Sequence, residues 1–253
     1  MTIAASLATL KVALGPKSER DIICAGVAAS FGVGVHEWLD VGVGDGRSLS
    51  KILAQLAEGR IRFNVIGVDP EAMPGLVCEP TNTFSVFDCF IEEFAIDRKF
   101  DVINVRQSAY YFENPPLILA ELIRTLRDGG KLFVTHWTQD CFLYQLHFLI
   151  AEELGLQPSA LALEELNCMI LRDTSRVVDQ VAVVVDTIDL QAVLSDPSVF
   201  EATLNIAARR LPASQLTNAA RTRLADAMAT RWPRQAVRAN GVLSLTAAPI
   251  EGA

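Results

Sequence analysis

Three glycines at alternate positions and two nearby acids form the stretch of sequence with the clearest chemistry. Gly42, Gly44 and Gly46 follow an apolar run, and Asp40 stands two residues before the first of them. Glycines at such a turn let the backbone bend sharply and approach a ligand closely. Their spacing differs from the G-x-G-x-x-G of dinucleotide sites, and the carboxylates of Asp40 and Asp45 would repel a pyrophosphate. The stretch favours a ligand that carries an ammonium group and no phosphate.

A third acid stands where the next strand is expected to end. Asp69 closes the segment RFNVIGVDP, 23 residues beyond Gly46. An acid at this place can accept hydrogen bonds from both hydroxyl groups of a ribose. Asp88, at the expected end of the third strand, could then reach an adenine amino group. A molecule with a cationic amino-acid end and a ribose end is S-adenosylmethionine, and we expect this cofactor.

Apolar stretches and glycine or proline breaks indicate that strands and helices alternate through residue 155, which predicts a parallel, doubly wound sheet. The last third differs, because a strand candidate at 176–190 is followed by two helices and a final strand candidate at 241–250. We therefore predict one domain with a helical insertion before the last strand. The expected helices cover residues 3–14, 18–30, 47–59, 115–130, 140–150, 163–171, 196–210 and 213–231. The helix over 115–130 begins with prolines and ends with glycines, the usual asymmetry.

The bulk composition excludes several classes of function. The chain has 253 residues, of which 51% are hydrophobic, enough for one sizeable core. The formal net charge is -8 without a block of basic residues, so we expect no nucleic-acid partner. No uninterrupted apolar run approaches the roughly 20 residues of a membrane span. Five scattered cysteines without a C-x-x-C pair, and an N-terminus without a signal-peptide pattern, indicate a cytoplasmic protein without a bound metal.

Four segments together resemble the successive motifs of class I S-adenosylmethionine-dependent methyltransferases: LDVGVGDG, VIGVDP, FDVINVRQSAYYFENP and LRDGGKLFVTHW. The resemblance covers about residues 35–137 and implies a Rossmann-like, seven-stranded sheet with the last strand antiparallel. It divides the single domain 1–253 into a helical lid (1–34), a cofactor-binding core (35–162) and an acceptor-side part (163–253). The expected cofactor-binding residues are Asp40, Gly42, Gly44, Gly46, Asp69, Pro70, Asp88, Cys89 and Arg106.

The segment after the fourth strand is where this family holds its acceptor. Gln107, Tyr110 and Tyr111 have a spacing similar to that in histamine N-methyltransferase-like small-molecule methyltransferases, where such residues line an amine pocket. Weaker similarities at KSER and NGVLSL add Glu19 and Asn240. Together with Trp137, the two tyrosines could attract a cationic acceptor through their ring faces. Ordinary packing is the alternative for Tyr111 and Trp137.

An amine acceptor must lose its proton before it attacks the methyl group, and three side chains are candidate bases. His136 ends the fifth strand, Glu19 stands near the start, and His147 lies on an apolar helix where a core role is the alternative. The proton could also leave to water before binding. The predicted catalytic residues are Tyr110, Tyr111, His136 and Glu19.

The expected function is methyl transfer to a small-molecule acceptor, most simply at an amine nitrogen, by a monomer or homodimer that contacts neither nucleic acid nor membrane. Arg106 beside Gln107 points instead to an acceptor with a carboxylate. A second reaction on the same fold and cofactor is cleavage on the aminobutyrate side, by aminopropyl transfer or cyclisation, which releases methylthioadenosine. A non-catalytic binding module is the third alternative.

Overall fold

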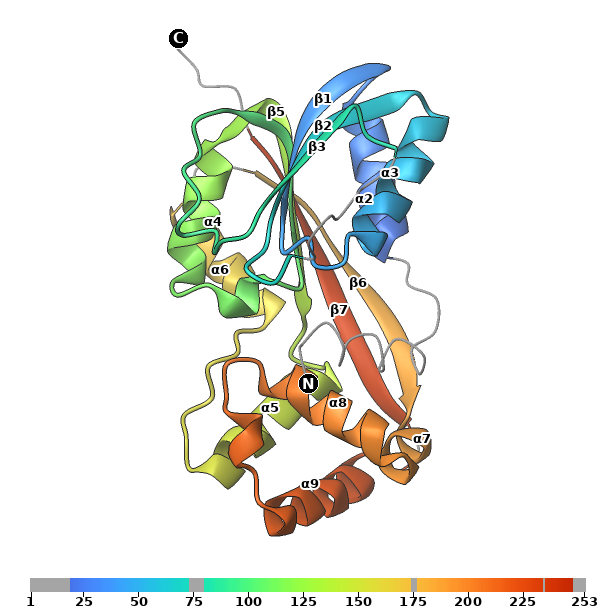
Figure 1. Cartoon of the computed structure of the whole chain (residues 1–253), viewed down its shortest axis with the longest axis vertical. Coiled ribbons are helices and arrows are strands. Elements are labelled where there is room, and N and C mark those ends of the chain that lie inside the picture. Colours follow the sequence, from blue (N-terminus) through green and yellow to red (C-terminus); the bar gives the residue numbers. More distant parts are fainter. Residues whose placement is uncertain (1–18, 73–79, 174–176, 234, 248–253) are drawn as a thin grey trace. The chain divides into compact units, whose positions relative to one another are not determined.

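The computed structural model describes residues 19–72, 80–173, 177–233 and 235–247 (Figure 1). The predicted helix over residues 3–14 lies outside these ranges. The strands are β1 (Gly34–Val41), β2 (Ile61–Val68), β3 (Thr83–Phe87), β4 (Phe100–Arg106), β5 (Leu126–Trp137), β6 (Val177–Asp189) and β7 (Gln235–Thr246). The helices are α2 (Glu19–Ser30), α3 (Arg47–Glu58), α4 (Pro115–Arg124), α5 (Phe142–Leu154), α6 (Leu163–Asp173), α7 (Leu190–Ser195), α8 (Pro197–Ala208) and α9 (Asn218–Arg231).

The strands form one seven-stranded sheet in the order β3-β2-β1-β4-β5-β7-β6. Strands β1 to β5 pair in parallel, and the last strand, β7, runs antiparallel (Figure 1). The predicted fold class is therefore confirmed, including the helical insertion of α7, α8 and α9 before β7. Because β1 lies between β2 and β4, the direction of chain progression across the sheet reverses between β1 and β4. Doubly wound sheets bind their ligands beyond the carboxyl ends of the strands at this reversal.

By contacts between residues, the chain divides into two compact units. Of the residues that the structure describes, the sheet unit comprises 19–72, 80–136, 163–173, 177–182 and 241–247, and the helical unit comprises 137–162, 183–233 and 235–240. In the sheet unit, α2 and α3 cover one face of the sheet, and α4 and α6 cover the other (Figure 1). The single domain over residues 1–253 stays a prediction.

Helix α3 shows how the sequence builds the face that carries α2. Leu49, Ile52, Leu53 and Leu56 recur at helical spacing and are all buried, in one core cluster with Trp38 and other residues of the sheet. Each such side chain contributes roughly 1.5–3 kcal/mol by leaving water. Gly59 ends the helix as predicted. This packing fixes the position of the glycine loop that precedes α3.

The predicted end of α4 was wrong. The helix begins at the two prolines, with the side chain of Asn114 accepting from the backbone of Leu117, but it ends at Arg124 instead of at the glycines. The glycines lie inside β5, where the pairing with β4 shifts between Phe100 and Val102. A Cβ on Gly130 would lie 2.9 Å from the carbonyl oxygen of Arg127. The glycines therefore serve a bulge between two strands and do not cap a helix.

In the helical unit, α5 packs against α8 and α9, and α7 packs against the same two helices. Helix α7 was not predicted, although the side chain of Asp189 caps it by accepting from two backbone N–H groups. Asp196 caps α8 in the same way. Strand β7 begins at Gln235, six residues before the predicted start at 241. Among the residues that the structure describes, no helix is both long and apolar enough to cross a membrane.

Candidate active site

The glycine loop after β1 has left-handed backbone at all three glycines, with φ of 82° at Gly42, 55° at Gly44 and 67° at Gly46. The reasons for glycine differ along the loop. A Cβ on Gly42 would lie 2.5 Å from the Cβ of Ser108, which follows β4, so this glycine admits the neighbouring loop. A Cβ on Gly44 would meet no atom within 4 Å. Gly44 therefore faces open space, as a glycine that admits a ligand would.

Asp69 directly follows β2 and is hydrogen-bonded to the glycine loop. Its Oδ2 accepts from the backbone N–H of Gly44 at 2.8 Å, and its Oδ1 accepts from Glu71 at 2.8 Å. Each carboxylate oxygen keeps a further lone pair, so the side chain can still accept from a ligand. The structure thus brings together two residues that the sequence predicted for one cofactor.

Asp40 lies on β1, accepts hydrogen bonds from two neighbouring side chains and is only 4% exposed. Its Oδ1 accepts from the side-chain amide of Asn104 at 2.6 Å and from the indole of Trp38 at 3.3 Å. No described residue donates to Oδ2. Burial raises the pKa of Asp40, whereas the bonds from Asn104 and Trp38 and the charge of Arg106 oppose this rise, and the charge of Asp69 adds to it.

Two buried polar residues, one on β4 and one on β5, were not singled out from the sequence. Asn104 is 1% exposed and Thr135 is fully buried. Within the described part of the chain, Asn104 Oδ1, Thr135 Oγ1 and the Nε of Arg106 are buried and have no hydrogen-bond partner. Buried polar atoms are rarely left unpaired unless a ligand, ion or water completes them. The available signal was a pair of polar residues inside otherwise apolar strands.

The expected acceptor residues Gln107, Tyr110 and His136 are also brought together. Gln107 has φ of 57°, unusual for a residue with a side chain, and its Oε1 accepts from the hydroxyl of Tyr110 at 3.0 Å. The ring of Tyr110 lies 3.7 Å from the imidazole of His136, centroid to centroid. The Nε2 of Gln107 is a buried donor without a partner among the described residues.

The other predicted residues of the sheet unit lie on α2, on the short helix after β4, and just after β2 and β3. Glu19 begins α2 and is 2% exposed, and Tyr111 is half-buried in the short helix after β4. Asp88 is exposed, and burial raises the pKa of the half-buried Cys89 thiol, with the charges of Glu93 and Asp88 adding to the rise. Pro70 is exposed.

Three predicted residues belong to the helical unit. Trp137 is buried, and the guanidinium of Arg209 lies 4.1 Å from its ring centroid, so one face of the indole already carries a cation. Asn240 is buried in β7. His147 has a complete set of hydrogen bonds, from its Nδ1 to Ala207 O at 2.9 Å and to its Nε2 from two backbone N–H groups. This is the arrangement of a core histidine.

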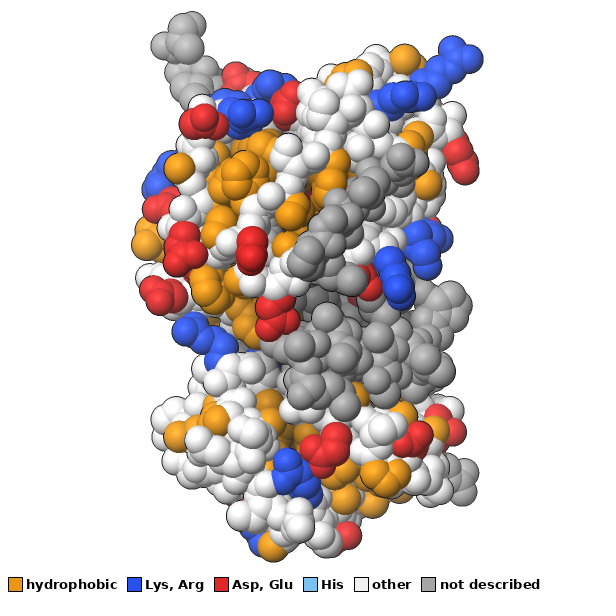
Figure 2. All heavy atoms as spheres, viewed as in Figure 1, with side chains coloured by type: hydrophobic (Ala, Val, Ile, Leu, Met, Phe, Trp, Pro, Cys, Tyr) orange, Lys and Arg blue, Asp and Glu red, His pale blue; other side chains and the backbone are white. Residues whose placement is uncertain are grey.

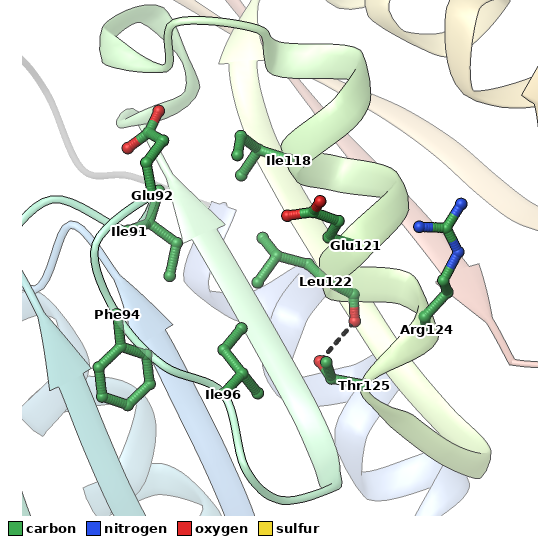
Figure 3. A pocket seen from close by; sticks show the side chains of 9 residues that line it. All are labelled: Ile91, Glu92, Phe94, Ile96, Ile118, Glu121, Leu122, Arg124 and Thr125. Carbon is green, nitrogen blue, oxygen red and sulfur yellow. Dashed lines mark hydrogen bonds between the residues drawn. The ribbon is translucent and has the colours of Figure 1, made fainter.

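A separate pocket of about 330 Å³ lies in the sheet unit between residues 91–96 and α4 (Figure 3). Ile91 and Ile96 lie opposite Ile118 and Leu122 of α4, and the acidic side chains of Glu92 and Glu121 also line the pocket (Figure 3). On the face shown in Figure 2, hydrophobic side chains gather over this region. None of the predicted site residues lines the pocket.

The chain matches a known protein family over most of its length. The sequence model of a family described as a methyltransferase domain matches residues 4–176. The chain belongs to this methyltransferase family. No curated protein matches it in sequence.

Solved structures share the fold of this methyltransferase at low sequence identity. A Bacillus halodurans C-125 protein that has been assigned as a methyltransferase is 15% identical, with a TM-score of 0.64 over 92% of this chain and 100% of that one. A methyltransferase of Geobacter sulfurreducens, solved with S-adenosyl-L-homocysteine, is 16% identical, with a TM-score of 0.52 over 91% and 90% of the two chains. The N-methyltransferase NodS of Bradyrhizobium japonicum WM9 is 14% identical, with a TM-score of 0.51 over 92% and 96%.

The cofactor of this methyltransferase is S-adenosylmethionine, as the family implies. The residues present fit this molecule. Gly44 leaves open space in the loop, Asp69 offers a carboxylate for a ribose, and Asn104 offers a buried acceptor without a partner. Within the described ranges, no three His, Cys, Asp or Glu side chains are grouped so as to hold a metal ion.

Proposed function

We propose that this methyltransferase transfers the methyl group to a nitrogen atom of a small-molecule amine. The observation that carries the proposal is the linked group of Gln107, Tyr110 and His136 at the ends of β4 and β5. It combines an amide donor without a partner, an aromatic ring and an imidazole at the edge of the sheet where doubly wound folds bind ligands. The fold shared with the N-methyltransferase NodS adds support.

The backbone of Gln107 is a second reason to place the acceptor here. A left-handed φ costs a residue with a Cβ roughly 1–2 kcal/mol, which glycine would avoid. Such strain is found mainly at functional sites, where the surrounding structure holds it. The backbone N–H of Gln107 donates to Thr135 O at 3.0 Å, and Tyr110 holds its amide. We therefore assign Gln107, whose backbone holds this strained conformation, to the binding of the acceptor.

Each residue has a definite task in the proposed reaction. The cofactor, when bound, supplies an electrophilic methyl group on a sulfonium. The amide of Gln107 holds the acceptor, so that its lone pair is aligned and the rate gains from proximity. His136 accepts the proton that the amine must lose, and Tyr110, packed on its ring, fixes the orientation of the imidazole. Tyr110 also orients Gln107, so it acts on both the acceptor and the base.

The test uses a pool of primary and secondary amines with methyl-deuterated S-adenosylmethionine, and fragmentation mass spectrometry locates the label. We expect the label on nitrogen, and label on oxygen or carbon contradicts the proposal. Once the acceptor is identified, Gln107→Ala should raise its KM or lower kcat by about tenfold, the loss of one hydrogen bond to a polar group. Affinity for S-adenosylhomocysteine should stay unchanged. A parallel loss of cofactor affinity would mean that Gln107 is structural.

A matched variant separates the side chain from the backbone. Gln107→Asn keeps the amide and tolerates left-handed backbone, but its shorter side chain cannot reach the hydroxyl of Tyr110 in the same way. Tyr110→Phe removes that hydroxyl and keeps the ring on His136. If the hydroxyl of Tyr110 orients Gln107 for the acceptor, both Gln107→Asn and Tyr110→Phe raise the acceptor KM. If only Gln107→Ala raises it, the hydroxyl of Tyr110 takes no part in holding the acceptor.

A further inference from the structure

The connection between β3 and β4 is made without a helix. Parallel strands are usually joined by a helix that packs on the sheet. Residues 88–99, all of which the structure describes, instead form turns and contain neither helix nor strand. The carbonyl groups of Phe90 and Ile91 accept from the backbone N–H groups of Glu93 and Phe94 in these turns. A groove therefore stays open between this segment and α4.

The groove has two walls, both from the sheet unit (Figure 3). One wall is a stripe of α4 at three- and four-residue spacing, which puts its members on one face of the helix: Ile118, Glu121, Leu122 and Thr125. The other wall consists of three apolar side chains: Ile91, Phe94 and Ile96. They enclose the volume of about 330 Å³ described above. We call the space between these walls the α4 groove.

The apolar surface continues beyond the α4 groove. Leu117, next to Ile118, is 49% exposed. Phe87, whose ring centroid lies 4.9 Å from that of Phe94, is 43% exposed. A small molecule in the groove would leave both side chains in water, whereas a segment of protein covers them together with the groove. Exposed apolar patches with a polar border are typical of protein interaction sites.

The border of the α4 groove is acidic. Glu92 and Glu121 line it, Glu93 adjoins Glu92 in the chain, and Glu113 donates its backbone N–H to Glu92 Oε1 at 3.0 Å. None of these four glutamates makes an ion pair with a residue in the described ranges. Arg124 is the basic residue among those that line the groove. The excess of negative charge favours a cationic partner and disfavours nucleic acid and anionic lipid.

The walls also indicate the form of the partner. Neither α4 nor the turns of residues 91–96 offers the unpaired edge of a strand, so an extended peptide cannot add to them as a further strand. Side chains must make the contacts, as when an amphipathic helix binds in a groove. A second copy of this chain is disfavoured, because it brings a net charge of -8 to an acidic border.

We propose that the α4 groove docks an amphipathic helix of a partner protein. The apolar face of that helix lies between the walls and covers Leu117 and Phe87, and Lys or Arg side chains along its margins pair with Glu92 and Glu121. Because α4 spans ten residues, or about 15 Å, a partner helix of about three turns matches it. None of the residues assigned to the cofactor or the acceptor lines the α4 groove, so the docked helix leaves the candidate active site accessible.

The experiment is an NMR titration of the full-length protein with its isoleucine δ1 methyl groups labelled. Ile91, Ile96 and Ile118 report on the α4 groove, and Ile52, which is buried in the core cluster of α3, is the internal reference. The probe is a synthetic helical peptide of leucine and lysine with all leucines on one face. A comparison peptide has the same composition, with leucines spread around the helix.

The proposal predicts that the first peptide shifts the methyl signals of the three reporters and leaves that of Ile52 in place. Leu117→Ser and Glu121→Lys should each weaken the binding by about tenfold. Two matched variants change exposed residues elsewhere and should bind as the wild type does. They are Leu156→Ser, at a leucine that is 43% exposed in the helical unit, and Glu58→Lys, at the exposed end of α3.

Four results would overturn the proposal. The three reporters could keep their signals, or both peptides could shift them equally. Phenethylamine that shifts the reporters where the peptide does not would make the groove a site for a small amine. Reporter signals that move with the concentration of the protein alone would assign the groove to a second copy of the chain.

Discussion

The side-chain amide of Asn104 donates to Oδ1 of Asp40 over 2.6 Å, between residues that are 64 positions apart in the chain. The two residues face each other across β1 and β4. This bond engages one carboxylate oxygen of Asp40 and leaves the other without a donor from the described residues. An acid that is buried and only half engaged can respond to an arriving cation.

The first prediction concerns the protons of Asp40. Burial raises the pKa of this carboxyl group, against the bonds from Asn104 and Trp38 and the charge of Arg106, whereas the charge of Asp69 raises it further. An ammonium group favours the ionised form, so binding of S-adenosylhomocysteine should release a proton as the pH falls toward this raised pKa. Affinity should fall over the same range, because the protonated acid no longer attracts the cation.

Calorimetry in buffers of different ionisation enthalpy measures this release. Asp40→Asn should bind S-adenosylhomocysteine more weakly at neutral pH and should release no proton. Proton release that is the same in Asp40→Asn as in the wild type would assign the titration to another group.

The second prediction compares two glycines of one loop. In Gly42→Ala the new methyl group would overlap Ser108, and the backbone has φ of 82°, so we expect a loss of roughly 3 kcal/mol or more in unfolding free energy. In Gly44→Ala the methyl group meets open space, and only the backbone cost of about 1–2 kcal/mol remains.

Thermal unfolding with and without S-adenosylhomocysteine separates the two effects. Gly44→Ala should lose much of the stabilisation by the ligand, since its methyl group occupies the open side of the loop. Ser108→Gly should restore part of the stability of Gly42→Ala. Full ligand stabilisation in Gly44→Ala would show that the ligand does not approach this residue.

The third prediction concerns Asp69, which we assign to the ribose. Asp69→Ala removes a charge-assisted contact, together with the bonds that hold Gly44 and Glu71. We expect the affinity for S-adenosylhomocysteine to fall by about tenfold to a hundredfold. Asp97→Ala, at an acid whose side chain is 80% exposed and belongs to no predicted site, is the control and should leave the affinity unchanged. Calorimetry that gives equal affinities for wild type and Asp69→Ala would remove Asp69 from the site.

Several of these residues could be predicted from the sequence because their signals are local. The motif consists of the loop of Gly42, Gly44 and Gly46 and the acid after the next strand, and it can be recognised within a short stretch of sequence. In the structure the backbone N–H of Gly44 donates directly to this acid, Asp69. Asn104 and Thr135 could not be found this way. The contact of Asn104 with Asp40 depends on the register of β1 and β4, which sets Asp40 against a residue 64 positions away.

Tertiary packing also explains two glycines for which the local sequence pattern had indicated another reason. The close contact that requires glycine at position 42 is with Ser108 and not with a ligand. Gly130 resembles the glycine that ends a helix, yet it lies in β5, where carbonyl groups of both strands leave little room for a Cβ. Ser108, Phe100 and Asp101 lie on other segments of the chain, so a window of sequence around either glycine does not contain them, whereas Arg127, the nearest neighbour of Gly130, does lie within such a window.

The fourth prediction concerns the pH dependence of stability in the helical unit. Burial lowers the pKa of His147 from its ordinary 6.5, the bond to Ala207 O opposes this, and the charge of Arg209 adds to it. A histidine with a lowered folded pKa contributes stability that is present above about pH 6.5 and is lost as the pH falls through the folded value. Protonation of Nε2 would leave the backbone N–H groups of Ser159 and Ala160 without an acceptor, at a cost of roughly 1–3 kcal/mol.

Urea unfolding at several pH values tests this. The wild type should lose stability between pH 7.5 and 5.5 faster than His147→Gln does, and His36→Gln should keep the acid sensitivity of the wild type. An unchanged pH profile in His147→Gln would place the sensitive group elsewhere.

The most direct test of the whole account is mass spectrometry of the purified protein after incubation with S-adenosylmethionine, with and without a pool of small metabolites. We predict S-adenosylhomocysteine that accumulates only with the pool, together with one metabolite that has gained a methyl group. Methylthioadenosine formed without any acceptor would contradict the account, because the reaction would then take place on the aminobutyrate side chain of the cofactor and not at its methyl group.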